Sequence, residues 1–310
     1  MTGRKVRHVV TVRDLSAPEI LALFRCAKQL KKNRIPSSRP LLGKVLGLLF
    51  HKPSVRTRVS FEVGMDQLGG QSLYMGPVEL EQGKRETSKD IARVLSRYLD
   101  GIVARTFAHE DVEEMARFSS IPVINGLSDD SHPCQALADL FTIQEKFGRL
   151  KGITLAYVGD GNNVCHSLLE ACARLGVHLN IATPSAYRPN PEVVRWAMQE
   201  VKRTSSRIQW TQDPQTAVRS AQVVYTDVWA SMGQEGEKRA RTRTFRRFQI
   251  NAGLMRKASR GALFMHCLPA HRGEEVTDEV MDSRASVVYD QAENRLHLQK
   301  AILLWLMGDK

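Results

Sequence analysis

Short apolar runs alternate with longer amphipathic stretches along most of the chain. The runs have the length of strands and lie at residues 45–50, 72–75, 101–105, 122–125, 153–158, 177–182, 223–227, 262–267 and 286–289. Apolar residues at helical spacing, together with helix start signals, predict helices at residues 16–27, 54–68, 87–98, 133–148 and 292–307. Strands that alternate with helices predict an α/β fold with mainly parallel central sheets.

Glycine residues divide this pattern near its middle. Gly148 and Gly152 flank a basic segment where one α/β series ends and another begins. A length of 310 residues also suits two domains of roughly 100–200 residues each. We therefore expect two similar-sized α/β domains, residues 1–148 and 149–290, with an active-site cleft between them.

Composition excludes several other classes of protein. Hydrophobic residues make up 42% and charged residues 25%, which is enough for a packed core. No apolar run approaches the roughly 18–20 residues that span a bilayer, and no apolar stretch follows the basic N-terminus as it does in a secretory signal. The five cysteines are odd in number and form no CxxC pair, which disfavours a disulfide framework and a zinc site. These features predict a protein of the reducing cytoplasm.

Charge widens the choice of partners. The net charge is +12, so nucleic acid, an anionic membrane and an anionic small substrate are the classes to weigh. Part of the excess is local, because residues 237–247 hold six basic residues and one acidic residue. Phe245 is the only aromatic residue among them, and such a run is typical of a solvated loop or helix face.

The segment Ser54-Val55-Arg56-Thr57-Arg58 follows a predicted strand and a proline. Ser54 is placed to cap the next helix, whose first turn carries unpaired N–H groups and the positive end of the helix dipole. Ser54 and Thr57 add hydroxyl donors, and Arg56 adds a planar fork that fits phosphate oxygens. The pattern fits an anion-binding site, and its alternative is an ordinary helix cap with exposed arginines.

A second candidate site lies at residues 131–139. Pro133 suits the first position of a helix, so His132 is expected at a strand-to-helix joint. Gln135 and Asp139 follow at positions that share one helix face. A histidine at the carboxyl end of a strand is well placed for a ligand oxygen, and its alternative is a helix cap.

Two further turns follow predicted strands in the second half. Residues 159–163, Gly-Asp-Gly-Asn-Asn, do not match GxGxxG, so a nicotinamide cofactor is not expected, although backbone N–H groups and an Asn amide remain available to a polar ligand. Asp227 lies at the end of another strand and could bind a cationic amine or simply form a loop hydrogen bond. Ser231 and Met232 follow it on a predicted loop.

The segment from Met265 to Gly273 combines a thiol, a proline, two histidines and an arginine. Cys267 fits either a reactive site or a buried small apolar residue, the usual state of a free cysteine. A metal held by both His266 and Cys267 is not expected, because strand alternation would place them on opposite faces.

Together these segments resemble the aspartate/ornithine carbamoyltransferase family, and within it the members that act on ornithine. The resemblance covers essentially the whole chain, and the motifs come in the family's order. Residues 54–58 resemble the carbamoyl-phosphate signature and residues 132–135 the second motif on that side. Asp227 with Ser231-Met232-Gly233 resembles the ornithine motif, and residues 266–269 the closing loop. Val55 departs from the family, where threonine is commonest, but the family uses mainly the backbone N–H there.

The resemblance implies an N-terminal domain for carbamoyl phosphate, joined by the final helix at residues 291–310, and a second domain for ornithine. It also implies a homotrimer with active sites at subunit boundaries. The Gln82-Gly83-Lys84 loop would lie close to a neighbouring subunit's site.

The resemblance assigns roles to particular residues. The phosphate would be bound by Ser54, Val55, Arg56, Thr57, Arg105 and Gln82. Thr57, Arg105 and His132 would polarise the carbonyl oxygen, and Gln135 would contact the carbamoyl nitrogen. The carbonyl groups of Cys267 and Leu268, together with Arg295, would complete that side.

For ornithine, Asp227 and Cys267 would lie close to the amine that attacks. Asn163, Ser231 and Met232 would hold the amino-acid end, and the loop at residues 231–233 would close over it. No metal and no organic cofactor is implied, because carbamoyl phosphate is already activated.

Two other readings remain at this point. The acceptor could be putrescine, an N-acylated ornithine or aspartate, although residues 231–233 favour free ornithine. The chain could also be a non-catalytic protein that uses its basic surface for binding. Neither nucleic acid nor a membrane is expected as a partner.

Overall fold

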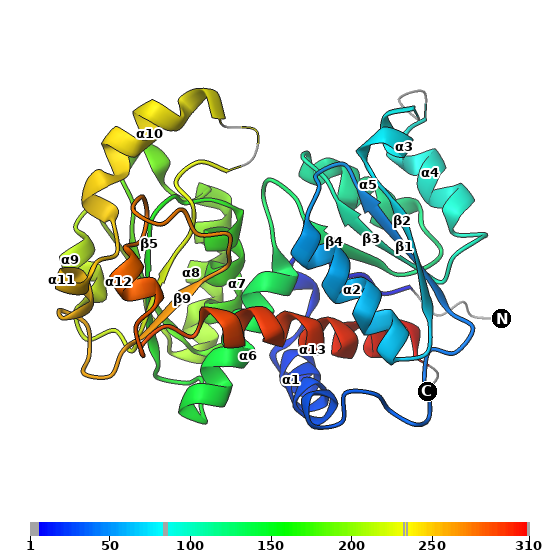
Figure 1. The fold of residues 1–310 in the computed structure, drawn as a ribbon, viewed down its shortest axis with the longest axis horizontal. Helices are drawn as coiled ribbons and strands as arrows, with labels where there is room; N and C mark the ends of the chain where they lie inside the picture. The colour runs from blue at the N-terminus through cyan, green and yellow to red at the C-terminus, as the bar shows by residue number, and fades with distance from the viewer. Residues whose placement is uncertain (1–5, 83–85, 232, 234, 309–310) are drawn as a thin grey trace. The chain divides into compact units, whose positions relative to one another are not determined.

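A computed structural model describes residues 6–82, 86–231, 233 and 235–308, and its ribbon is drawn in Figure 1. The chain divides into two compact units. Unit 1 comprises Met1–Leu137 with Asn294–Lys310, and unit 2 comprises Ala138–Glu293. The division falls inside two helices, α6 (Pro133–Phe147) and α13 (Val288–Met307).

Unit 1 contains a four-stranded parallel sheet. Its strand order is β2 (Gln71–Met75), β1 (Val45–Phe50), β3 (Gly101–Arg105) and β4 (Val123–Leu127). The strands β1 and β3 are almost wholly buried, as continuous apolar runs in parallel sheets usually are. The helices that lie wholly within this unit are α1 (Ala17–Lys32), α2 (Val55–Gln67), α3 (Pro77–Gln82), α4 (Ser88–Leu95) and α5 (His109–Phe118).

Local signals in the sequence set the helix ends. Ser54 and Thr87 cap α2 and α4, and their side-chain oxygens accept backbone N–H groups of the first turn. Two residues past α2, Gly69 has a φ of 88°, a conformation that favours glycine. These predicted helices are confirmed.

Unit 2 contains a five-stranded parallel sheet. Its strand order is β7 (Ile208–Thr211), β6 (His178–Ala182), β5 (Thr154–Val158), β8 (Val223–Thr226) and β9 (Leu263–His266). Its helices are α7 (Asn163–Leu175), α8 (Pro191–Thr204), α9 (Pro214–Val218), α10 (Lys238–Phe245), α11 (Ala252–Met255) and α12 (Asp278–Met281). The predicted α/β fold with mainly parallel sheets is therefore confirmed.

One predicted strand is wrong. Residues 286–289 form only a single bridge, between Ser286 and Phe264, and Val288 already begins α13. A short apolar run fits both a strand and the first turn of a buried helix, so its pattern alone does not separate them. The strand β7 was not predicted, because only Ile208 and Trp210 of its four residues are apolar, and Gln209 and Trp210 are exposed.

Each sheet has one point where its strand order reverses. In unit 1 the chain moves outward from β1 to β2 and then returns to add β3 on the other side of β1. In unit 2 it moves outward from β5 to β7 and then returns to add β8 beside β5. Ligands of such sheets bind beyond the carboxyl ends of the strands at these reversal points.

Among the described residues, no helix is long and apolar enough to cross a membrane. All five cysteines are free thiols.

Candidate active site

The reversal point of unit 1 carries the first group of predicted site residues. Phe50, the last residue of β1, pairs with Arg105, the last residue of β3, so the segments that follow both strands start at the same edge. Ser54 caps α2, and its Oγ accepts the N–H of Thr57 at 3.3 Å. The structure therefore brings the α2 N-terminus to the strand end that bears Arg105.

Arginines from three parts of the chain place positive charge near this edge of the sheet. Arg105 is buried, and its Nε donates to the carbonyl of Lys52 at 3.0 Å. Arg295, from α13, donates to Thr57 Oγ1 at 2.8 Å. Burial, followed by the charges of Arg295 and Arg56, lowers the pKa of Arg105 to about 9. Crowded cations of this kind fit an anionic ligand, whose charge would offset theirs.

His132 and Gln135 lie at the start of α6 and are both almost wholly buried. Burial, followed by the charges of Arg295 and Arg105, lowers the pKa of His132 well below its usual value. The imidazole is therefore neutral at pH 7 and can donate one hydrogen bond without carrying charge. Burial likewise raises the pKa of the neighbouring Cys134 to about 12 and keeps this thiol protonated.

For three predicted site residues, the described part of the structure shows no contact that supports a role in binding. Val55, where the family most often has threonine, begins α2 and is 78% exposed, so its side chain is free of packing. Gln82 ends α3, but its side chain lies outside the described part of the structure, and Met232 lies outside the described residues.

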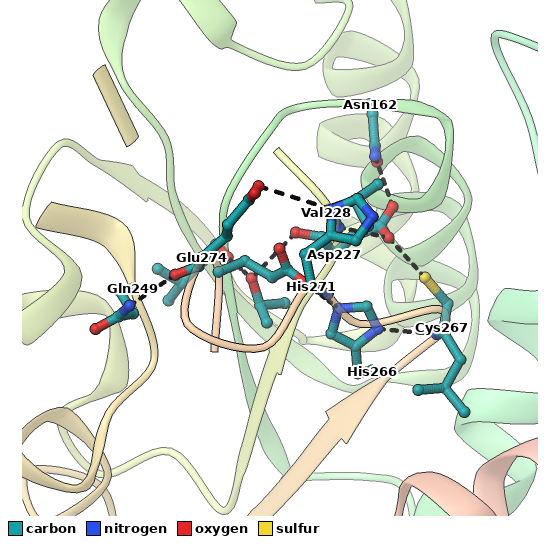
Figure 2. A network of polar contacts seen from close by, with 12 residues as sticks. Asn162, Asp227, Val228, Gln249, His266, Cys267, His271 and Glu274 are labelled. Atoms are coloured by element: carbon teal, nitrogen blue, oxygen red, sulfur yellow. Dashed lines mark hydrogen bonds and ion pairs between the residues drawn. The ribbon is translucent and has the colours of Figure 1, made fainter. Parts of the chain in front are cut away.

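The reversal point of unit 2 carries a carboxylate instead of cations. Asp227 directly follows β8 and is buried (Figure 2). Its Oδ1 accepts the thiol of Cys267 at 2.8 Å and the N–H of Val228 at 2.8 Å, and its Oδ2 accepts the amide of Asn162 at 2.7 Å. The two strand-end turns and the segment after β9 thus meet at one carboxylate.

Asn162, which sequence reasoning did not select, is the residue that joins two of these turns. It caps α7, and its Oδ1 accepts the N–H groups of Val164 and Cys165 at 3.0 and 3.1 Å. An Asn directly before an apolar helix was the available signal for this cap. Asn163 is the first residue of α7 and is half-buried, as is Ser231 on the loop beyond Asp227.

The prediction that His266 and Cys267 lie on opposite strand faces is wrong. Ligand atoms of Asp227, His266 and Cys267 all lie within 4.8 Å of one another. The reason is that β9 ends at His266, so strand alternation does not extend to Cys267, and Leu268 has a φ of 58°. The chain therefore turns back just where the alternation was assumed to continue.

Both ring nitrogens of His266 are already engaged. Its Nδ1 accepts the N–H of Leu268 at 2.8 Å, and its Nε2 lies 3.2 Å from a carboxylate oxygen of the fully buried Glu275. His266 therefore holds the Cys267–Leu268 turn in place, and a metal at this cluster would have to displace one of those bonds.

The protonation of Cys267 limits what it can do. Burial raises the pKa of its thiol well above the usual value, and the adjacent Asp227 carboxylate raises it further. At neutral pH the thiol is therefore a hydrogen-bond donor to Asp227, and the carboxylate is the acceptor.

The basic run at residues 238–247 differs in part from the expected solvated face. It forms α10 and a 3-10 turn, and most of its basic side chains are exposed. Arg241, however, is 7% exposed and forms an ion pair of 2.7 Å with Asp160, and Phe245 is fully buried. One cation of the run is thus part of the interior of unit 2.

Two doubly wound sheets, one with cations and one with a carboxylate at its reversal point, are suited to bind two polar ligands of opposite charge. Residues 7–145 match the model of the "Aspartate/ornithine carbamoyltransferase, carbamoyl-P binding domain", and residues 151–306 match the "Aspartate/ornithine carbamoyltransferase, Asp/Orn binding domain". The chain belongs to the aspartate/ornithine carbamoyltransferase family.

Individual relatives agree with this assignment. The chain is 53% identical to an ornithine carbamoyltransferase of Thermococcus kodakarensis, over 97% of this chain and 96% of the relative. It is 54% identical to one of Bacillus thuringiensis, over 97% of this chain and 94% of the relative. The solved structure of the ornithine carbamoyltransferase of Pyrococcus furiosus superposes with a TM-score of 0.94 at 52% identity and covers 98% of each chain. The resemblance drawn from the motifs is confirmed.

Proposed function

We propose that this chain transfers the carbamoyl group of carbamoyl phosphate to the δ-amine of L-ornithine, which yields L-citrulline and phosphate. The observation that carries the proposal is the opposite charge of the two strand-end sites. The cations around Arg105 suit an anionic donor, and the carboxylate of Asp227 suits an amine. Membership of the family makes carbamoyl transfer the reaction that uses both.

The residues of unit 1 would bind and activate carbamoyl phosphate. We assign the phosphate to Ser54, Thr57, the backbone N–H groups of Val55 and Arg56, the side chains of Arg56 and Arg105, and Gln82. The first turn of α2 supplies N–H donors, and the arginines supply forks that match phosphate oxygens. The same cations would stabilise phosphate as it leaves.

The carbonyl oxygen gains negative charge as the amine attacks. We assign its stabilisation to Thr57, Arg105 and His132, because fixed donors aimed at developing charge lower the barrier without reorganising. A neutral His132 suits this role, since it can donate a hydrogen bond. Gln135 would bind the carbamoyl nitrogen, and Arg295, which already contacts Thr57, would complete the side with the carbonyl groups of Cys267 and Leu268.

The amine of ornithine must lose its proton before it attacks. Its pKa as a free alkyl amine is near ~10.4, so most of it is protonated at pH 7. Asp227 is the proposed acceptor for the proton, because the thiol of Cys267 stays protonated and donates to that carboxylate. Asn163, Ser231 and Met232 would hold the amino-acid end.

The proposal is tested by citrulline formation from carbamoyl phosphate and L-ornithine. Putrescine, N-acetylornithine and aspartate are assayed in parallel as acceptors. Turnover with ornithine alone is the expected result. Turnover only with another acceptor would keep the carbamoyl-phosphate half and refute the ornithine half. Absence of turnover with all four, together with salt-dependent retention on DNA, would favour a basic binding protein instead.

We also propose that the chain forms a homotrimer through unit 1 and acts in the cytoplasm. Apolar side chains are exposed on the edge strand β2 and on the helices beside it, namely Val55 (78%), Val59 (49%), Leu73 (55%) and Val78 (68%). Because α2 and α3 both contact β2, these apolar side chains lie on neighbouring elements, as in an interface. Light scattering after size exclusion should give three times the 34.9 kDa chain mass, and Leu73→Glu should lower it. A wild-type monomer would refute the trimer.

A further inference from the structure

Among the basic residues of α10, Arg241 differs from its neighbours in burial and in contacts. Arg239 and Arg243 are exposed, whereas Arg241 is 7% exposed. Its Nη1 donates to Asp160 Oδ2 at 2.7 Å and to the carbonyl of Trp229 at 3.0 Å, and its Nε donates to Glu237 Oε2 at 3.0 Å. A buried guanidinium that satisfies three acceptors is held in a single orientation.

Two of these acceptors lie in the turns that follow β5 and β8. Asp160 precedes Asn162 and Asn163 in the turn after β5, and Trp229 lies between Asp227 and Ser231 in the turn after β8. Arg241 therefore bonds both turns at the reversal point of the unit 2 sheet. A second side-chain link between these turns is the bond of Asn162 to Asp227 at 2.7 Å.

Packing around Arg241 extends the connection. Its guanidinium lies 4.8 Å from the centroid of the Tyr187 ring, and the carbonyl of Tyr187 accepts the N–H of Gly161 at 3.0 Å. A Cβ on Gly161 would lie 2.3 Å from the backbone of Pro189, so this turn sits directly against that loop. The Trp229 ring stacks on Phe245, one helical turn beyond Arg241, with 6.0 Å between ring centroids.

The ionisation of Asp160, the buried partner of Arg241, depends on the charge of that arginine. Burial raises the pKa of the Asp160 carboxyl to about 6, while the charge of Arg241 and its hydrogen bond act in the opposite direction. An ion pair buried in this way leaves an uncompensated group if either side chain is removed.

We propose that Arg241 is a positioning residue for the site of the second substrate. Through its bonds to Asp160 and to the carbonyl of Trp229, Arg241 fixes the two turns that carry Asn163 and Ser231. It does not touch the reacting atoms, and it acts through the residues that hold the amino-acid end. This inference rests on the proposed ornithine reaction. It predicts that loss of Arg241 weakens the use of ornithine and spares the use of carbamoyl phosphate, whose proposed ligands lie mainly in unit 1.

The test is steady-state kinetics of Arg241→Gln with each substrate varied in turn. Because the bonds of Arg241 lie within the protein, their loss reaches ornithine as the cost of ordering the two turns when the substrate binds. If that cost equals one charge-assisted hydrogen bond, binding weakens about tenfold or more. KM for ornithine should therefore rise about tenfold or more, while KM for carbamoyl phosphate stays within about twofold of wild type. Arg241→Lys should recover part of the loss, because a lysine can reach Asp160 or the Trp229 carbonyl but cannot fork between them.

Two further variants separate positioning from general damage. Arg243→Gln removes the same charge from the exposed face of the same helix and should leave both KM values unchanged. Asp160→Asn should raise KM for ornithine, and the double variant with Arg241→Gln should be no worse than the poorer single variant. Should Arg241→Gln fail to fold, Arg241→Lys and Asp160→Asn carry the same comparison.

The outcomes distinguish this inference from the proposed function. An unchanged KM for ornithine in Arg241→Gln, equal losses for both substrates, or additive effects in the double variant would refute the positioning role while the wild type still makes citrulline. A wild type that makes no citrulline would refute the proposed function, and this inference with it.

Discussion

Substitution of Arg105 by alanine tests the donor half of the site. Arg105 is buried at the end of β3 and is proposed to act on both the phosphate and the carbonyl oxygen. Removal of one donor to a developing oxyanion lowers kcat by about 10²–10³-fold. Because Arg105 also binds the phosphate in the ground state, KM for carbamoyl phosphate should rise as well.

Stability should respond quite differently from activity. The pKa of Arg105 is lowered to about 9, first because the group is buried and then because Arg295 and Arg56 repel it. At 1.36 kcal/mol per unit, this shift means that folding disfavours the charged side chain by about 5 kcal/mol. The substitution removes that cost, but it also removes the bond to the Lys52 carbonyl and the packing of a large buried side chain, together about 3–6 kcal/mol. We expect the free energy of unfolding without ligand to change by no more than about 2 kcal/mol.

The assay pairs citrulline formation at saturating substrates with urea unfolding of the ligand-free protein. Arg117→Ala, an exposed arginine of α5 in the same unit, is the control and should leave kcat unchanged and stability within about 0.5 kcal/mol. Addition of inorganic phosphate should stabilise the wild type more than Arg105→Ala, because the anion offsets the crowded cations. Near-normal kcat in Arg105→Ala, or a loss of about 4 kcal/mol in stability with normal kcat, would refute the reasoning.

Three further predictions concern pH and the second half of the site. Asp227→Asn should lower kcat/KM for ornithine about 100-fold or more. Cys267→Ser should stay within about tenfold of wild type, because the serine hydroxyl can also donate to Asp227. A larger loss in Cys267→Ser than in Asp227→Asn would assign proton transfer to the thiol. Wild-type activity should rise between about pH 6 and pH 9 as the amine of ornithine is freed, and a flat profile measured at fixed subsaturating ornithine would contradict this. The pKa of the fully buried Lys300 is lowered to about 8 by burial and by the charge of Arg34. Between about pH 8 and pH 10.5 the unfolded chain therefore binds one more proton than the folded chain, and the free energy of unfolding of the wild type should rise by about 3 kcal/mol over that interval. Urea titrations of Lys300→Met should not show this rise.

Much of the fold follows from local patterns. Ser54 before α2, Thr87 before α4 and Pro133 at the start of α6 are signals within a few residues of the structure they set. The prediction missed strand β7 and wrongly placed a strand at residues 286–289 for a related reason. Exposure of Trp210 and burial of Val288 depend on which neighbours pack against them, and a short window of sequence does not contain those neighbours.

The candidate site could be predicted as residue types and less well as contacts. The resemblance to the family assigns roles to Arg105, His132, Asp227 and Cys267. It did not select Asn162, although that amide binds the Asp227 carboxylate, and it treated Arg241 as one charge in an exposed run. An arginine run looks the same in sequence whether its members are solvated or buried.

The amino-acid sequence determines which strands end in polar turns, because strand length, helix caps and glycine turns depend on neighbouring residues. Only the tertiary structure decides which of those turns meet. Arg295 reaches Thr57 across 238 positions, and Arg241 reaches Asp160 across 81. Contacts of this kind depend on the order of the strands in each sheet, and that order is set by packing the whole apolar interior rather than by any local signal.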